Sequence, residues 1–277
     1  MQSRSAPQLT AQPWFRLRVA ACLLCALGFF LCVKNAVPHA PQRIASPVPD
    51  AGAPAIIIDP GHGGKDPGRV SGTEYEKHWA LKVSLALADE LRRRGYPVEL
   101  TRTDDSYPEL VERAAFSNSR ERLAFVSIHF NASESDASGI ETYFAWPREP
   151  ETMARLALRH NAPPDRQIMD GRSRQLAERV QASVTAATGA RDRGVLNNTS
   201  HAVTRRTEAP SILVECGFLT NAAELALIQT DEYRARLVQG LADGIHGWIA
   251  SGAGADTIQF EPIAPAADPT PELLENP

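Results

Sequence analysis

The chain has 277 residues, of which 43% are hydrophobic and 22% charged, and its formal net charge is −4. This length and apolar content are enough for one large globular domain with a core of its own. The slightly acidic balance gives no basic footprint, so nucleic acid is not an expected partner.

The first predicted element is an uncharged apolar segment, residues 19–33, between Arg18 and Lys34. Its length is at the upper end for a signal-peptide core and short of the roughly 20 residues that span a bilayer comfortably. A cleaved signal peptide and an uncleaved membrane anchor both stay open for residues 1–34. Both predict export to the periplasm or cell envelope, with membrane contact only through this segment. A Pro-rich linker, residues 35–52, follows it.

Three of the four cysteines lie in that apolar segment, which leaves only Cys216 for the rest of the chain. An internal disulfide in the folded domain is therefore excluded. Cys216 directly follows an acidic residue at the end of a predicted strand, and we expect a buried thiol rather than a nucleophile.

A folded domain is expected over residues 53–252, because apolar runs alternate there with amphipathic patterns. In the helix predicted at 74–94, Val83, Leu87 and Leu91 recur at helical spacing. Strands are predicted at 55–59, 98–102, 124–129, 140–144, 202–205 and 211–215, and further helices at 109–118, 174–188, after Asn221, and at 233–250. This order predicts an α/β fold, an open and largely parallel twisted sheet flanked by helices.

Two segments receive no predicted helix or strand. Residues 147–171 are a polar insertion, and residues 253–277 are rich in Pro, Ala and acid. We expect the second segment to be a disordered tail.

Three ionisable residues stand at the ends of predicted strands. His62 follows “AIIID”, His129 ends “FVSIH”, and Glu215 ends “SILVE”. Each alone is as easily explained as a solvated loop residue. Because ligands of open α/β sheets bind beyond the carboxyl ends of the strands, we expect the three to converge on one rim. Such a cluster indicates a metal or acid/base site.

Glu76 is a fourth candidate, at the start of the long helix, and it has two interpretations. The run “TEYE” fits a capping box, in which the glutamate only caps its own helix. Alternatively, two imidazoles and one carboxylate with an open fourth position form the usual catalytic zinc set, and a second carboxylate nearby acts as general base. The spacing alone leaves both open.

The loop “GHGGKDPG” around His62 has the glycine content of a phosphate-binding loop but not its spacing. Its glycines are better explained by positive φ angles and close approach of a substrate. His201, before the predicted strand at 202–205, is a further candidate for a substrate contact.

Five ordered motifs, “IIIDPGHGGKDPG”, “EKHWAL”, “SIHFNA”, “GIETYF” and “ILVECGFLTN”, resemble those of the zinc-dependent N-acetylmuramoyl-L-alanine amidases of bacterial cell walls. The resemblance covers about residues 55–250. It implies His62, Glu76 and His129 as zinc ligands and Glu215 as the catalytic base, and so favours the ligand interpretation of Glu76. The implied substrate is peptidoglycan, cleaved between N-acetylmuramic acid and L-alanine in cell-wall remodelling or daughter-cell separation.

The resemblance also implies that Arg205 and Asn131 contact substrate, and that Asp59 shapes the loop. Some relatives carry an autoinhibitory helix at the place of residues 147–171, and a protein activator is a further partner to be tested. Two alternatives remain, a zinc peptidase acting on stem peptides and a catalytically silent wall-binding domain.

Overall fold

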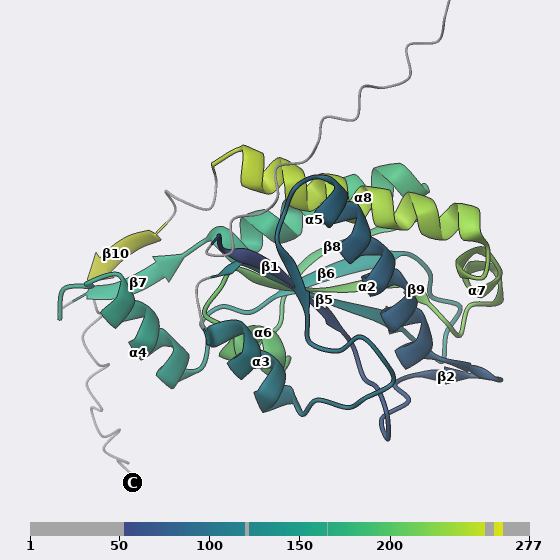
Figure 1. The fold of residues 1–277 in the computed structure, drawn as a ribbon, viewed down its shortest axis with the longest axis horizontal. Coiled ribbons are helices and arrows are strands. Elements are labelled where there is room, and N and C mark those ends of the chain that lie inside the picture. Colours follow the sequence, from purple (N-terminus) through teal and green to yellow (C-terminus); the bar gives the residue numbers. More distant parts are fainter. Residues whose placement is uncertain (1–52, 120–121, 165, 253–257, 263–277) are drawn as a thin grey trace, which may run out of the picture. The chain divides into compact units, whose positions relative to one another are not determined.

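A computed structural model describes residues 53–119, 122–164, 166–252 and 258–262, and the segments predicted at 1–34 and 35–52 lie outside them. A six-stranded sheet in the order β4-β1-β5-β9-β6-β8 lies at its centre (Figure 1). The strands are β1 (Ala55–Pro60), β4 (Val98–Leu100), β5 (Arg122–Asn131), β6 (Ile140–Phe144), β8 (Asp192–Asn197) and β9 (Ser211–Phe218). Four of the five pairings are parallel and only β6 against β9 is antiparallel, which confirms the predicted α/β class.

Helices cover both faces of the sheet, and the two layers differ in size. One face carries α2 (Glu76–Arg93), α5 (Arg172–Thr188) and α8 (Asp231–Ala250), and the other carries the short helices α3 (Leu110–Asn118) and α6 (Ala202–Arg206) (Figure 1). Side chains alternate along β1, so Ile56 and Ile58 enter the large core under α2, whereas Ile57 packs with Phe125 and Val203 on the α3 and α6 face.

The same alternation decides where the polar strand-end residues point. Ile128, Phe130, Val214 and Cys216 belong to the large core. Residues between them point to the opposite face of a strand, so His129 and Glu215 lie on the face that carries α3 and α6. Burial raises the pKa of the Cys216 thiol well above its ordinary value, as expected for a buried, unreactive cysteine.

The helix predicted at 74–94 is confirmed as α2, which begins two residues later than predicted. Val83, Leu87 and Leu91 are buried along α2 as the spacing predicts. Thr73 does not cap it, because the helix begins at Glu76 and residues 74 and 75 form β3 (Glu74–Tyr75), paired with β2 (Val70–Ser71). The predicted helix after Asn221 is α7 (Ala222–Ile228), and the Asn221 side chain caps it. No helix in the described part of the chain is long and apolar enough to cross a membrane.

Two predictions of local structure are wrong. Residues 202–205 form helix α6 instead of a strand, because Val203 packs against the sheet and Thr204 Oγ1 turns back to the His201 carbonyl. Residues 192–197, predicted as a loop, form the edge strand β8, which is stabilised by pairing with β6. In both cases tertiary contacts outweigh a weak local pattern.

The insertion and the tail also contain regular structure. Within residues 147–171 lie α4 (Pro150–Arg159) and β7 (Arg166–Asp170), and β10 (Ile258–Pro262) pairs antiparallel with β7. The expectation of a disordered tail is therefore wrong at residues 258–262. The alternation of Ile258 and Phe260 is too short to stand out in a segment rich in Pro and Ala.

A buried ion pair joins the two ends of the insertion, and its arginine also contacts Ser173 of α5. Arg148 is inaccessible to solvent, and its guanidinium donates to the Ser173 hydroxyl at 2.9 Å and faces Asp170 at 3.5 Å. Burial lowers the pKa of Arg148 to about 10. Burial raises the pKa of Asp170, but the hydrogen bond from Arg172 and the charge of Arg148 outweigh it, and the pKa is lowered.

Asp170→Asn is expected to reduce the free energy of unfolding by about 3 kcal/mol at pH 7, because it leaves the Arg148 charge buried without its partner. The lowered pKa of Asp170 contributes stability above its unfolded value of about 3.9, which is lost as the pH falls through the folded value. Urea unfolding should therefore show a smaller difference in the free energy of unfolding between the wild type and Asp170→Asn at pH 3 than at pH 7. The exposed control Asp89→Asn should change little, and equal stability of both variants at pH 7 would contradict the assignment.

Candidate active site

Three predicted residues meet at the carboxyl ends of the central strands. His62 follows β1, Glu76 is the first residue of α2, and His129 lies near the end of β5. Glu76 Oε1 lies 3.0 Å from His62 Nε2 and 2.8 Å from His129 Nδ1. One ligand atom from each residue lies within 4.8 Å of the other two. Two imidazole nitrogens and one carboxylate oxygen at this spacing fit zinc, which prefers such a set.

The Glu76 carboxylate serves this cluster and not the end of its helix. Its Oε2 accepts the Arg69 backbone N–H at 2.8 Å, and its Oε1 accepts the Phe130 N–H at 3.1 Å. Tyr75, the residue that caps α2, makes no side-chain cap hydrogen bond. The capping-box interpretation of Glu76 is therefore wrong, and its position agrees with the ligand interpretation.

Contacts within the cluster shift the pKa values of Glu76 and His62. Burial raises the pKa of Glu76, but hydrogen bonds to His129 and His62 outweigh it and hold the pKa well below its usual range. Burial lowers the pKa of His62, and the Glu76 and Asp66 carboxylates outweigh that effect and raise it. The ionised Glu76 carboxylate thus stabilises positive charge between the two imidazoles, where a divalent cation would take the place of the ring protons.

Asp66 orients His62 and was not singled out from the sequence. Its Oδ2 lies 2.8 Å from His62 Nδ1, so the ring donates its Nδ1 proton there and keeps Nε2 for the cluster. The backbone of His62 has φ 58°, unusual for a residue other than glycine. Arg113 donates to the His62 carbonyl at 2.7 Å and pairs with Asp59 at 2.9 Å, so Asp59 supports the loop as expected.

Close packing explains one glycine of the His62 loop. Gly68 has φ +65°, and a Cβ there would lie 2.6 Å from both Glu76 Oε2 and His62 Cδ2. The absent side chain makes room for two residues of the cluster, in addition to any approach of a substrate.

Gly68→Ala is expected to displace these side chains and weaken zinc binding about 10- to 100-fold, the range measured when groups that orient metal ligands are lost. Gly72→Ala is a matched control, because Gly72 has φ +60° and a Cβ added there would meet nothing within 4 Å. Zinc titration against a competing chelator compares the two variants. If Gly68→Ala and Gly72→Ala bind zinc with equal affinity, contact of the added Cβ with the cluster does not weaken zinc binding, and the prediction is contradicted.

Glu215 lies beside the cluster in a different environment. It pairs in register with His129 on β5 and with Glu141 on β6. Its Oε2 is buried and makes no hydrogen bond within the described residues. Burial, followed by the charges of Glu76 and Glu141, raises its pKa well above the usual value. A carboxylate with a free buried oxygen and a raised pKa has the properties of a general base.

Glu141, a second residue not singled out from the sequence, connects Glu215 to the neighbouring strands. Its Oε1 accepts hydrogen bonds from Asn131 Nδ2 and from the Tyr143 hydroxyl, both at 2.7 Å, and its Oε2 accepts one from Arg193 Nε at 2.7 Å. Asn131, predicted to contact substrate, thus lies next to the site and is held by Glu141. An acidic residue inside the apolar run “GIETYF” was the signal that could have identified Glu141.

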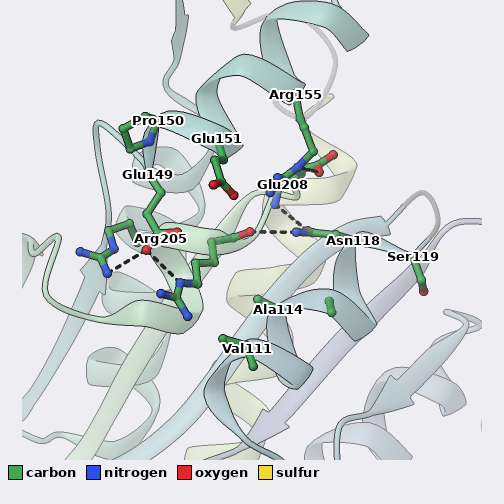
Figure 2. Close-up of a pocket in the computed structure, with 12 residues that line it drawn as sticks. Val111, Ala114, Asn118, Ser119, Glu149, Pro150, Glu151, Arg155, Arg205 and Glu208 are labelled. Carbon is green, nitrogen blue, oxygen red and sulfur yellow. Dashed lines mark hydrogen bonds and ion pairs between the residues drawn. The ribbon is translucent and has the colours of Figure 1, made fainter.

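Arg205 lies elsewhere. Its Nη2 pairs with Glu149 Oε1 at 2.8 Å. It lines a cavity of about 930 Å³ between α3, α4 and α6, whose lining residues are drawn in Figure 2. The interactions described for Arg205 do not include any with the cluster of His62, Glu76 and His129. The structure therefore does not bring it together with the other predicted site residues.

His201 is nearer to the cluster than its sequence context indicated. Its ring packs edge-on against Tyr143, with 4.8 Å between ring centroids, and its buried Nδ1 has no hydrogen-bond partner among the described residues. Burial, followed by the charge of His129, lowers its pKa. His201 thus places a partly buried imidazole ring near the site.

The insertion does not plug the cluster in this structure. Arg155 and Arg159 of α4 each pair with Glu208 at 2.6 Å. In Figure 1, α4 lies beside β7 at the left, whereas α2 begins beside β2 at the lower right. In this view the described helix of residues 147–171 therefore lies away from the start of α2.

Comparison with known proteins agrees with this geometry. The family model described as N-acetylmuramoyl-L-alanine amidase matches residues 56–247. N-acetylmuramoyl-L-alanine amidase LytC of Bacillus subtilis is 31% identical over 190 residues, which are 68% of this chain but 34% of LytC. The chain thus spans about a third of the length of that curated relative.

Two solved structures are similar over nearly their whole length. An N-acetylmuramoyl-L-alanine amidase from Clostridium difficile 630 is 34% identical with a TM-score of 0.60, covering 72% of this chain and 98% of that one. The CwlD amidase from Clostridioides difficile, solved in complex with the GerS lipoprotein, is 27% identical with a TM-score of 0.60, covering 72% of this chain and 100% of that one. Together with the family match, these similarities show that the chain belongs to the N-acetylmuramoyl-L-alanine amidase family.

Proposed function

We propose that this protein hydrolyses the amide bond between the lactyl group of N-acetylmuramic acid and the L-alanine of the peptidoglycan stem peptide. The observation that carries the proposal is the buried, unpartnered Oε2 of Glu215 beside the cluster of His62, Glu76 and His129, within the residues that the structure describes. Such a pair of features, a metal site and an adjacent free carboxylate, is what metal-assisted amide hydrolysis requires.

In this mechanism His62, Glu76 and His129 would hold zinc, which when bound supplies a Lewis acid that acidifies water and polarises the scissile carbonyl. Glu215 Oε2 accepts a proton from the attacking water and returns it to the alanine nitrogen as the C–N bond breaks. The products are a lactyl carboxylate and a stem peptide with a free amino group. Asp66 keeps the His62 ring oriented throughout.

Metal dependence tests the proposal. The full-length chain should release stem peptides from purified peptidoglycan, lose this activity in a chelator, and regain it when zinc is added back. Activity that persists in metal-free protein would contradict the assignment of His62, Glu76 and His129.

A zinc peptidase acting on stem-peptide bonds is the second candidate, because it would use the same cluster and the same base. A silent wall-binding domain is disfavoured, because a domain without catalysis has no need for the complete set of cluster and base residues. Product identity separates the first two functions, and the absence of any product from zinc-loaded protein indicates the third or the need for an activator.

We also propose that residues 1–34 direct export, which agrees with an envelope substrate. A fusion of residues 1–52 to a reporter active only outside the cytoplasm should be active. The solved complex of CwlD with a lipoprotein supports testing an envelope protein as activator of this chain.

A further inference from the structure

A second cavity lies next to the candidate active site, on the side of β6 and β8. It has a volume of about 520 Å³, and its walls include Asn131, Ser133, Arg191, Arg193 and Phe218. We call it the Arg193 cavity. Asn131 is two residues beyond His129 on β5, so this wall of the cavity lies next to the cluster of His62, Glu76 and His129.

A row of side chains across neighbouring strands links the two sites. His129, Glu215 and Glu141 are register partners on β5, β9 and β6. Arg193 on β8 continues the row by donating to Glu141 at 2.7 Å. Neighbouring strands lie about 4.8 Å apart, so the backbones carrying Glu215 and Arg193 are separated by about 10 Å. Two extended residues of a bound peptide cover about 7 Å, and the long Arg193 side chain is able to span the rest of the distance between its backbone and the peptide.

Arg193 is positioned to bind an anion. Its Nε is occupied by Glu141, and its guanidinium lies over the Phe218 ring at 4.9 Å. Its side chain is 29% exposed, and its Nη groups make no hydrogen bond with the residues the structure describes. A guanidinium held by one carboxylate and an aromatic face is pre-organised for a second carboxylate.

The nearby carboxylates already have donors of their own. Glu141 accepts from Asn131, Tyr143 and Arg193. Asp136, which also lines the cavity, accepts from Asn221, and the buried Glu224 accepts from two backbone N–H groups. The exposed Arg191 adds a second cation at the cavity wall.

We propose that the Arg193 cavity binds a carboxylate of the stem peptide, on the residue that follows the L-alanine. The inference rests on the proposed function. On the muramic acid side of the scissile bond the lactyl carboxyl is consumed in the amide, so a free carboxylate comes from the peptide side. The cavity therefore assigns the peptide to the β6 and β8 side of the cluster and makes a free carboxylate at the second residue a specificity determinant.

Two matched substrates test this inference with the full-length protein. They are N-acetylmuramyl-L-alanyl-D-glutamine, in which the α-carboxylate is the free carboxylate, and the corresponding D-glutamine α-amide, which has no free carboxylate on this residue. The wild type should show a KM for the acid about tenfold or more below that for the amide, the effect of one charge-assisted hydrogen bond.

Arg193→Gln should remove this difference by raising KM for the acid alone, and Arg193→Lys should retain part of it. The amidated substrate is the internal control for the support that Arg193 gives to Glu141, because loss of that support slows both substrates equally. Arg236→Gln, on the exposed side of α8, should leave both KM values unchanged.

Equal KM values for the two substrates in the wild type, or an equal loss on both in Arg193→Gln, would overturn the inference while leaving the amidase function intact. If neither substrate is cleaved, calorimetric binding of the dipeptide L-alanyl-D-glutamate decides. If the wild type binds the dipeptide and Arg193→Gln does not, the carboxylate site is supported and only the proposed amidase function has failed. If the wild type does not bind the dipeptide, the carboxylate site is overturned as well.

Discussion

Replacing Glu215 with glutamine is expected to lower kcat on peptidoglycan by about 10³-fold while zinc content and stability stay at the wild-type level. The amide has the shape of the carboxylate but cannot accept the water proton. Glu215 Oε2 has no hydrogen-bond partner in the described residues, so the substitution breaks no contact there. Single-turnover rates, metal analysis and thermal unfolding of the same preparations check the three parts of this expectation.

A matched control for the loss of one carboxylate is Glu232→Gln, on an exposed turn of α8. It should retain wild-type activity. If Glu215→Gln keeps more than about a tenth of the wild-type rate, Glu215 is not the general base, since proton transfer by a positioned side chain contributes at least about 10²-fold.

Glu76→Gln is expected to give the second large effect, on metal binding. It removes the anion between His62 and His129, and the neutral amide is a weaker zinc ligand. Loss of a group that merely orients a ligand costs about 10- to 100-fold in metal affinity, so loss of a ligand should cost more than about 100-fold. After dialysis against a weak chelator the variant should contain no zinc, whereas Glu215→Gln should remain loaded.

The contrast between these two variants separates the roles of the two carboxylates. Helix α2 should persist in Glu76→Gln, because its stability comes from the apolar stripe of Val83, Leu87 and Leu91, which a circular dichroism spectrum can verify. Wild-type zinc affinity in Glu76→Gln would contradict the ligand assignment and restore a purely structural role for this residue.

The position of the site was predictable because it follows from the topology. Parallel strands bring their carboxyl ends to one edge, so His62, His129 and Glu215 had to be neighbours once the α/β pattern was recognised. The role of Glu76 was not predictable from spacing, because a capping residue and a ligand occupy the same position of a helix. The family resemblance favoured the ligand interpretation, and the tertiary contacts with both histidines agree with it.

The residues that support the site were harder to find. Asp66 follows His62 by four positions inside a loop whose path depends on positive φ angles, so its contact with the ring is invisible without coordinates. Glu141 needed the antiparallel pairing of β6 with β9, which the prediction of a largely parallel sheet did not specify. Arg205 pairs with Glu149 from the insertion, a segment that was interpreted as polar and in which helix α4 was not predicted.

The most direct test of the amidase assignment is mass spectrometry of the products that the full-length, zinc-loaded protein releases from purified peptidoglycan, with Glu215→Gln as the inactive control. We expect intact stem peptides that begin with a free L-alanine amino group, together with glycan strands whose muramic acid carries a free lactyl carboxylate. Fragments cut within the stem peptide, with alanine still attached to muramic acid, would contradict this assignment and identify a peptidase.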